Sequence, residues 1–140
     1  MQNLFPKLFF FTCLIFSNLS LLFSQEGVVL NGQASYYHDK FDGRMTASGE
    51  VFDQDGMTCA HKTLDFGTIL KVTNLENNLS VTVRVNDRGP FVEGRIVDLT
   101  KAAAQKIGLY EMGVCNAKVE IISINDQIAS LPPPQNNEPV

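Results

Sequence analysis

Residues 79–86 carry the feature that most restricts the fold, an alternation of apolar and polar side chains with a period of two. One face of this stretch carries Val81, Val83 and Val85, and the other carries Thr82, Arg84 and Asn86. This period is typical of a strand with one buried face and one exposed face. Turn-forming residues over 74–78 separate it from a second strand-like stretch over 68–73, so the two predict a β-hairpin.

The pattern elsewhere is also mainly of the β type. Further strands are expected over 28–37, 96–99 and 117–122. One short helix is expected over 101–106, where Thr100 can cap the N-terminus and Gly108 can end the helix. Many short strands with one short helix indicate an all-β domain built as a closed or nearly closed barrel.

The length of 140 residues allows one domain, which we expect over 28–128. Residues 1–24 have the order of a secretory signal peptide, because Lys7 precedes an apolar run from Leu8 to Phe16 and polar residues follow. That run is shorter than the span of about 20 residues that a membrane-crossing helix needs, although later leucines leave an uncleaved anchor as the alternative. The proline-rich residues 129–140 are expected to be a disordered tail.

Export implies a location in the periplasm or elsewhere in the cell envelope, with no membrane span in the mature chain. Cys13 lies in the leader, but the residues before it fit a lipid-attachment site poorly, so no lipid anchor is expected. Without residues 1–24 the chain has ten basic and fifteen acidic residues, a net charge of −5. This balance argues against nucleic acid and anionic membrane surfaces as partners, because both are bound through Lys and Arg. A neutral polymer such as a glycan remains compatible.

Cys59 and Cys115 are the cysteines of the mature chain. An oxidising compartment permits a disulfide between them, and two separate buried thiols are the equally plausible alternative. A zinc site made of these two cysteines with His38 and His61 lacks a recognisable ligand spacing, so no metal is expected. No phosphate-binding loop is present either, and no cofactor is expected.

Two glycine-containing loops, over 41–50 and 85–91, each carry a carboxylate next to strands. Glu50 and Asp87 can converge at one end of a barrel, where a buried carboxyl group can protonate a glycosidic oxygen. The alternative is that both are ordinary turn residues. His61 can contact such a carboxylate or a sugar, or have no role. Aromatic side chains that can stack on sugar rings or fill the core are Tyr36, Tyr37 and Phe41.

Several runs of residues together resemble the rare lipoprotein A family. The most specific is Val83-Arg84-Val85-Asn86-Asp87-Arg88-Gly89-Pro90-Phe91. The others lie, in the family's order, over 32–37, 41–53, 60–68, 72–75 and 94–104. The similarity covers nearly the whole expected domain.

The resemblance implies a six-stranded double-psi β-barrel and a lytic transglycosylase that acts on peptidoglycan glycan strands, with a preference for strands stripped of stem peptides. Such an enzyme cleaves between N-acetylmuramic acid and N-acetylglucosamine without water and leaves a 1,6-anhydro end. The family's catalytic aspartate matches Asp87, which is the expected general acid/base, and two further active-site positions match Glu50 and His61. Asp98 matches an acid that is interpreted as structural, bonding backbone near the helix start.

The candidate substrate-binding residues in the matching loops are Tyr37, Arg44, Thr46 and Arg88. The alternatives to an enzyme are an expansin-like module that binds and loosens peptidoglycan without cleaving it, and a structural envelope protein that binds a protein partner. The three matching active-site positions favour the enzyme.

Overall fold

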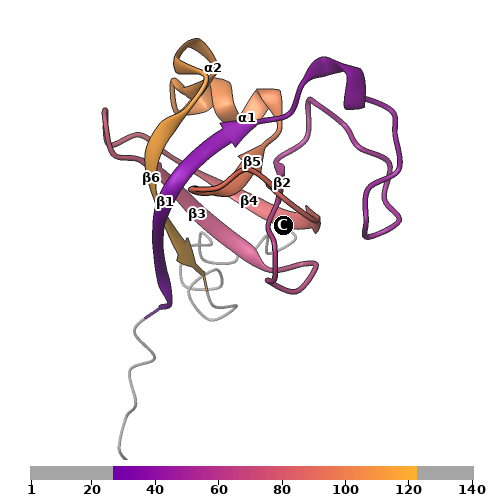
Figure 1. Ribbon diagram of the computed structural model, residues 1–140, viewed down its shortest axis with the longest axis horizontal. Helices are drawn as coiled ribbons and strands as arrows, with labels where there is room; N and C mark the ends of the chain where they lie inside the picture. Colours follow the sequence, from indigo (N-terminus) through magenta and orange to yellow (C-terminus); the bar gives the residue numbers. More distant parts are fainter. Residues whose placement is uncertain (1–26, 123–140) are drawn as a thin grey trace, which may run out of the picture.

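The computed structural model describes residues 27–122, so the expected signal peptide and tail lie outside the described residues. Six strands form a closed barrel in the order β1-β5-β2-β4-β3-β6 (Figure 1). Their bounds are β1 Val29–Tyr36, β2 Thr58–Ala60, β3 Ile69–Asn74, β4 Ser80–Asp87, β5 Arg95–Leu99 and β6 Cys115–Ile121. The all-β barrel is therefore confirmed, and the strands with a clear sequence pattern lie within two residues of their expected bounds.

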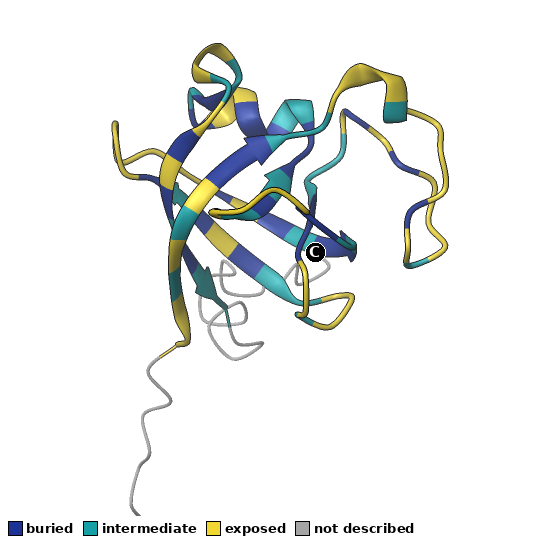
Figure 2. Cartoon of the chain, in the orientation of Figure 1, coloured by how far each residue is buried: buried dark blue, intermediate teal, exposed yellow. Residues whose placement is uncertain are grey.

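The predicted hairpin is formed by β3 and β4, which pair antiparallel from Ile69 opposite Arg84 to Thr73 opposite Ser80. The alternation of β4 works as expected, because Val81, Val83 and Val85 belong to the buried core. Figure 2 shows buried residues alternating with intermediate and exposed ones along the strands. The hairpin is thus the regular wall of the barrel, and its register follows from its hydrophobic pattern.

The sequence pattern missed β2, which has only three residues. It lies between β4, to which it runs parallel, and β5, to which it runs antiparallel. Three residues are too few for a periodicity to be recognised. The strand is nevertheless needed, because it closes the gap between β4 and β5 in the barrel (Figure 1).

Two helices lie together at one end of the barrel (Figure 1). The expected helix is α1, Lys101–Lys106, and Thr100 caps it by accepting a hydrogen bond from the backbone N–H of Ala103. Gly108 ends α1 as expected, with a φ of 68° that favours glycine. It also caps a second helix, α2 (Leu109–Met112), which was not predicted because its four residues follow that stop signal directly.

The segment over 37–57, named here the 37–57 loop, leaves the barrel after β1 and returns to it at β2 (Figure 1). It begins with a 3-10 turn, η1 (Asp39–Phe41). Its two arms are tied together by backbone hydrogen bonds from Gly43 to Phe52 and from Phe52 to Arg44. Phe52 is buried, although most of the loop is exposed (Figure 2). The loop is therefore a folded element that can hold side chains in fixed positions.

Cys59 on β2 and Cys115 on β6 are separate buried thiols. Their strands are not neighbours in the barrel. Burial raises the pKa of Cys59 to about 12 and that of Cys115 to about 11, so both are protonated and unreactive at neutral pH. Of the two alternatives that the sequence left open, the structure therefore has the apolar fillers rather than the disulfide.

None of the helices among residues 27–122 has both the length and the apolar content needed to cross a membrane.

Candidate active site

An irregularity in the pairing of β2 with β4 places Asp87. Cys59 lies opposite Val85, but the next residue, Ala60, lies opposite Asp87, so Asn86 is an extra residue in the ladder. Such a bulge interrupts the alternation of faces and re-aims the side chains that follow it. Val85 points into the core, whereas Asn86 and Asp87 both contact the 37–57 loop on the opposite, outer face of the sheet.

The carboxylate of Asp87 accepts hydrogen bonds from three fixed donors. The hydroxyl of Tyr37 donates to Oδ2 at 2.5 Å. The backbone N–H of Ala47, in the 37–57 loop, donates to Oδ1 at 2.8 Å, and the N–H of Arg88 donates to the same oxygen at 2.9 Å. These contacts fix the orientation of the carboxylate from two sides, by the loop and by its own strand end.

Tyr37 is held against Asp87 by its ring as well as by its hydroxyl. The ring packs on Phe52 with centroids 4.4 Å apart and on Phe41 at 5.9 Å. Burial, then the hydrogen bond to Asp87, raise the pKa of Tyr37 far above its ordinary value, so the hydroxyl stays protonated and donates. The expected substrate-binding residue Tyr37 therefore has its polar atom directed at Asp87.

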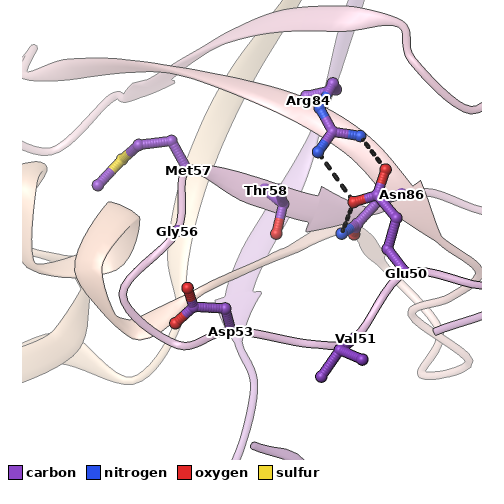
Figure 3. Close-up of a pocket in the computed structure, with 8 residues that line it drawn as sticks. All are labelled: Glu50, Val51, Asp53, Gly56, Met57, Thr58, Arg84 and Asn86. Atoms are coloured by element: carbon purple, nitrogen blue, oxygen red, sulfur yellow. Dashed lines mark hydrogen bonds and ion pairs between the residues drawn. The ribbon is translucent and has the colours of Figure 1, made fainter. Parts of the chain in front are cut away.

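Glu50 lies on the same outer face but does not contact Asp87. Arg84 donates to both of its oxygens, at 2.5 Å and 2.9 Å, and Asn86 Nδ2 donates to Oε2 at 3.2 Å (Figure 3). Hydrogen bonds from Arg84, then from Asn86, lower the pKa of Glu50 to about 2. Glu50 is therefore ionised at neutral pH and serves as an anion in a polar network.

A cavity of about 330 Å³ opens beside this ion pair. It is lined by Glu50, Val51, Asp53, Gly56, Met57, Thr58, Arg84 and Asn86 (Figure 3). Thr58 pairs with Arg84 and Ala60 pairs with Asp87, so the cavity and Asp87 lie along the same two strands.

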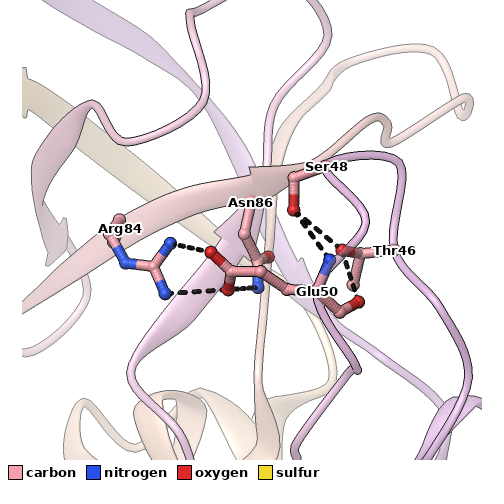
Figure 4. A network of polar contacts seen from close by, with 5 residues as sticks. All are labelled: Thr46, Ser48, Glu50, Arg84 and Asn86. Atoms are coloured by element: carbon pink, nitrogen blue, oxygen red, sulfur yellow. Dashed lines mark hydrogen bonds and ion pairs between the residues drawn. The ribbon is translucent and has the colours of Figure 1, made fainter.

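The polar network continues into the 37–57 loop (Figure 4). The Thr46 hydroxyl donates to the backbone oxygen of Glu50 at 2.9 Å and lies 3.0 Å from the hydroxyl of Ser48. The backbone N–H of Ser48 donates to the backbone oxygen of Asn86. Thr46, an expected substrate-binding residue, is buried and holds the turn that carries Glu50.

His61 lies directly after β2, next to Asp87. Its backbone N–H donates to the backbone oxygen of Asp87, and its ring Nδ1 accepts from the N–H groups of Thr63 and Leu64, both at 3.1 Å. A ring nitrogen that accepts carries no proton, so the proton of the neutral imidazole is on Nε2. Burial, with the nearby charges of Arg88 and Lys62, lowers the pKa of His61 and favours this neutral form.

The remaining expected substrate-binding residues differ in what they touch. Arg88 donates to the backbone oxygens of His61 and Leu64, and its guanidinium lies 4.0 Å above the ring of Phe66. It therefore braces the turn that carries His61. Arg44 is exposed on the 37–57 loop, with its guanidinium 5.8 Å from the centroid of Phe41, and its polar atoms are free to meet a ligand.

Asp98 does not have the structural contact expected for it. The N–H groups at the start of α1 are bonded by Gln54 and Thr100. Within residues 27–122, the buried Oδ1 of Asp98 has no hydrogen-bond partner. Burial raises the pKa of this carboxyl group.

Asp87 is thus bonded by the Tyr37 hydroxyl and by the backbone N–H of His61. Glu50 does not touch Asp87 but is bonded by the neighbouring residue, Asn86. Sequence reasoning did not select Arg84 and Asn86 as site residues. Their position on the polar face of the predicted strand was the signal that could have identified them. Among the described residues, no group of three His, Cys, Asp or Glu side chains is arranged to hold a metal ion.

Comparison with known proteins agrees with this architecture. Residues 29–121 match the family described as lytic transglycolase. The chain is 46% identical over 112 residues to the "Endolytic peptidoglycan transglycosylase RlpA" of Vibrio cholerae, which covers 80% of this chain and 43% of that protein. It is 52% identical over 101 residues to the protein of the same name from Pasteurella multocida, covering 72% of this chain and 34% of that protein. The chain therefore spans less than half the length of these curated relatives.

Two solved structures share the fold. A Streptomyces papain inhibitor superposes with a TM-score of 0.57 and 22% identity, covering 69% of this chain and 96% of the inhibitor. An expansin from Clavibacter michiganensis superposes with a TM-score of 0.56 and 20% identity, covering 69% of this chain and 52% of the expansin. At this identity the likeness concerns the fold alone, because one fold serves many functions.

Proposed function

Because the chain belongs to the rare lipoprotein A family of lytic transglycolases, with its double-psi β-barrel, we propose that it is a peptidoglycan lytic transglycosylase exported to the periplasm or cell envelope. The observation that carries this proposal is the site around Asp87. A carboxylate held by three donors lies at the end of β4, where the backbone of His61 bonds the same residue and a polar cavity lies beside the same strands. The names of the curated relatives supply the substrate class.

In the proposed reaction Asp87 is the general acid/base. It gives a proton to the glycosidic oxygen between N-acetylmuramic acid and N-acetylglucosamine as the bond to the anomeric carbon breaks. It then accepts the proton of the muramyl 6-hydroxyl as that oxygen bonds to the same carbon. One bond is broken and one is formed, no water is consumed, and the product carries a 1,6-anhydromuramyl end. General acid–base catalysis of this kind contributes typically about 10²–10⁴-fold.

The other residues of the site have supporting roles in this proposal. The Glu50 carboxylate cannot act as a proton donor at neutral pH with a pKa of about 2, so its charge and its bond to Asn86 organise the cavity next to Asp87. The Nε2–H of His61 is available as a donor to the sugar or to the developing charge on its oxygen. Arg44 is the residue we expect to contact the glycan directly, whereas Tyr37, Thr46 and Arg88 act through the groups they hold.

The net charge fits the preferred form of the substrate. Stem peptides add carboxylates to the glycan, and the chain without residues 1–24 has a net charge of −5. Like charges repel, and at the surface this repulsion weakens as salt is added. We therefore expect strands stripped of stem peptides to be cleaved faster than intact peptidoglycan, and the difference to shrink at high ionic strength.

The direct test is digestion of purified peptidoglycan, with and without amidase treatment, by the chain and by its Asp87→Asn variant. Products with anhydromuramyl ends, detected by mass spectrometry, are expected from the unmodified chain only. Asp55→Asn is the matched control, because Asp55 is exposed and does not line the cavity, and it is expected to keep full activity. No product from any form, with binding to the glycan retained, would refute the enzyme and favour an expansin-like binding module.

A further inference from the structure

Gln54, near the end of the 37–57 loop, has a buried side-chain amide that is bonded on both sides. Its Oε1 accepts from the backbone N–H of Lys101, the first residue of α1, at 2.8 Å. Its Nε2 donates to the backbone oxygen of Tyr37 at 3.1 Å and to Oδ1 of Asp39 at 3.4 Å. Gln54 therefore links the start of α1 to the start of the 37–57 loop.

The two ends of this amide are not interchangeable. A reversed amide would set its oxygen against the oxygens of Tyr37 and Asp39, and its NH₂ group against the first N–H of α1, so all three bonds would be lost. The backbone of Gln54 is held as well. Its N–H donates to Oδ1 of Asp42 at 3.0 Å, and its oxygen accepts from the N–H of Ala102 at 3.0 Å. The amide is thus a fixed donor toward Tyr37 and a fixed acceptor toward α1.

The bond from Gln54 acts on the residue that donates to Asp87. The N–H of Tyr37 donates to the backbone oxygen of Leu99 at 3.0 Å, and the oxygen of Tyr37 accepts from Gln54. The peptide groups on both sides of the Tyr37 Cα are therefore held. Because a residue has only two soft backbone dihedrals, this fixes the direction in which the side chain leaves the backbone. The Tyr37 hydroxyl reaches Asp87 from that position, and a hydrogen bond weakens steeply when its geometry is lost.

Capping of α1 explains only half of these contacts. The helix already has a cap in Thr100, whose hydroxyl accepts from the N–H of Ala103. The acceptor of Gln54 adds to this cap, but its donor faces away from α1, toward Tyr37. The donor half therefore needs an explanation at the active site.

We propose that Gln54 is a positioning residue of the active site, which acts through Tyr37 on the carboxylate of Asp87; this inference rests on the proposed transglycosylase function. Gln54 gives and takes no proton in the reaction. It holds the backbone of Tyr37 so that the Tyr37 hydroxyl keeps the Asp87 carboxylate oriented while Asp87 transfers the proton.

The substitution Gln54→Glu separates the two halves of the contact. A carboxylate at this position can still accept from the first N–H of α1, but it has no hydrogen to donate to the Tyr37 oxygen. Thr100→Ala is the matched control, because it removes a cap of α1 and leaves the bond from Gln54 to Tyr37 in place. A loss of activity in the first variant alone therefore isolates the positioning of Tyr37 from the stability of the helix start.

Gln54→Glu is expected to lower kcat for the release of anhydromuramyl products by about 10–100-fold, the scale of a misplacement of about 1 Å. KM should not change, because an interaction that acts only in the transition state lowers kcat and kcat/KM equally. Thr100→Ala should keep both constants in its folded fraction. A rise in KM with kcat unchanged would refute the proposal, since Gln54 would then serve binding of the glycan in the ground state.

A double-mutant cycle tests whether the effect passes through Tyr37. In a chain that already carries Tyr37→Phe, Gln54→Glu should lower kcat by less than about twofold, because the hydroxyl that Gln54 positions is absent. Losses that multiply would show that Gln54 acts by another route, which overturns the proposal.

A measurement on Tyr37 itself separates this inference from the proposed function. The chain has three tyrosines, so in a chain with ¹³C-labelled tyrosine the Tyr37 signal is the one that Tyr37→Phe removes. Gln54→Glu should shift the Cζ signal of Tyr37 as its hydroxyl leaves the carboxylate, and Thr100→Ala should not. If the unmodified chain releases product but this signal does not shift, the positioning role is refuted and the transglycosylase stands. If the unmodified chain releases no product, the proposed function fails and the catalytic role of Gln54 fails with it.

Hydrogen exchange in the unmodified chain does not depend on whether a variant folds. The side-chain NH₂ group of Gln54 should exchange with solvent at least about tenfold more slowly than that of Gln105, which is exposed on α1. Equal exchange rates would show that the amide is not held against Tyr37, and the proposal would be wrong.

Discussion

The two walls of the barrel differ in regularity. The wall formed by β3, β4 and β6 pairs without a break, from Leu70 opposite Ile121 to Asn74 opposite Ala117 and along the whole β3–β4 hairpin. The wall formed by β1, β5 and β2 contains a register shift between Gln33 and Ala34, and its junction with β4 contains a second one, between Cys59 and Ala60. The proposed catalytic groups lie at the second wall and at the end of β4 that joins it.

This difference has a physical reason. A regular ladder alternates its side chains between core and solvent, which is efficient for burial but puts only every second residue on the outer face. A bulge can place two consecutive residues, here Asn86 and Asp87, on that face. The regular wall therefore supplies stability, and the irregular wall, together with the end of β4 that joins it, supplies a dense group of polar side chains.

The largest expected effect tests the regular wall. Leu70 on β3 is fully buried in the core. Leu70→Ala should lower the free energy of unfolding by about 2–5 kcal/mol, through lost burial and the cavity left behind. Urea denaturation followed by circular dichroism measures this loss. In the fraction that remains folded, activity per molecule should be unchanged, and a selective loss of activity would show that the two walls are not separable.

The irregular wall is tested by Tyr37→Phe. The ring keeps its contacts with Phe52 and Phe41, so the fold should be retained, but Asp87 loses the donor at its Oδ2. A hydrogen bond to a charged group contributes about 1.5–3 kcal/mol, which corresponds to a loss of about 10–100-fold in activity. Release of anhydromuramyl products, measured beside thermal unfolding, checks this. Full activity would mean that Tyr37 does not position Asp87.

The regular wall could be predicted from the sequence better than the irregular wall, because regular alternation leaves a local pattern and irregular pairing does not. Period-two alternation identified the hairpin, and Thr100 and Gly108 identified the bounds of α1, because these signals are local. β2 was not predicted, because its three residues show no local pattern and its position depends on the neighbouring strands β4 and β5. Asp98 was assigned to the helix start because it is near it in sequence, whereas its neighbours in space, Ala60 and Ser35, come from two other strands.

Contacts within the site were also beyond what local sequence patterns could predict. The resemblance selected Asp87, Glu50 and His61, but the sequence did not indicate that Arg84 holds Glu50 or that the Tyr37 hydroxyl is directed at Asp87. These contacts join residues 34 and 50 positions apart. They depend on how the 37–57 loop folds back on the barrel, which no local pattern specifies.

Thr100→Ala tests how the irregular wall is attached to the helical end. The Thr100 hydroxyl donates to the backbone oxygen of Gly56 at 2.6 Å and accepts from the N–H of Ala103, so it links the segment before β2 to α1. Loss of such a cap typically costs about 0.5–2 kcal/mol. We expect a lower unfolding temperature together with faster amide exchange at Thr58 and Cys59. Unchanged exchange there would show that β2 is held by its strand neighbours alone.

The smallest effect is expected at the exposed ion pair of Glu50 with Arg84, whose side chains are 44% and 39% exposed. Solvent screening limits such a pair to less than about 1 kcal/mol. The pKa of Glu50 is lowered from 4.5 to about 2 in the folded chain, so its contribution to stability is complete above pH 4.5 and is lost as the pH falls toward 2. Arg84→Gln should remove this loss, and the variant and the unmodified chain should therefore approach equal stability near pH 2. Urea denaturation at a series of pH values between 2 and 7 measures the difference. A difference in stability between the two chains that does not change with pH would mean that Arg84 stabilises the fold by packing its aliphatic stem, and not by holding the Glu50 carboxylate.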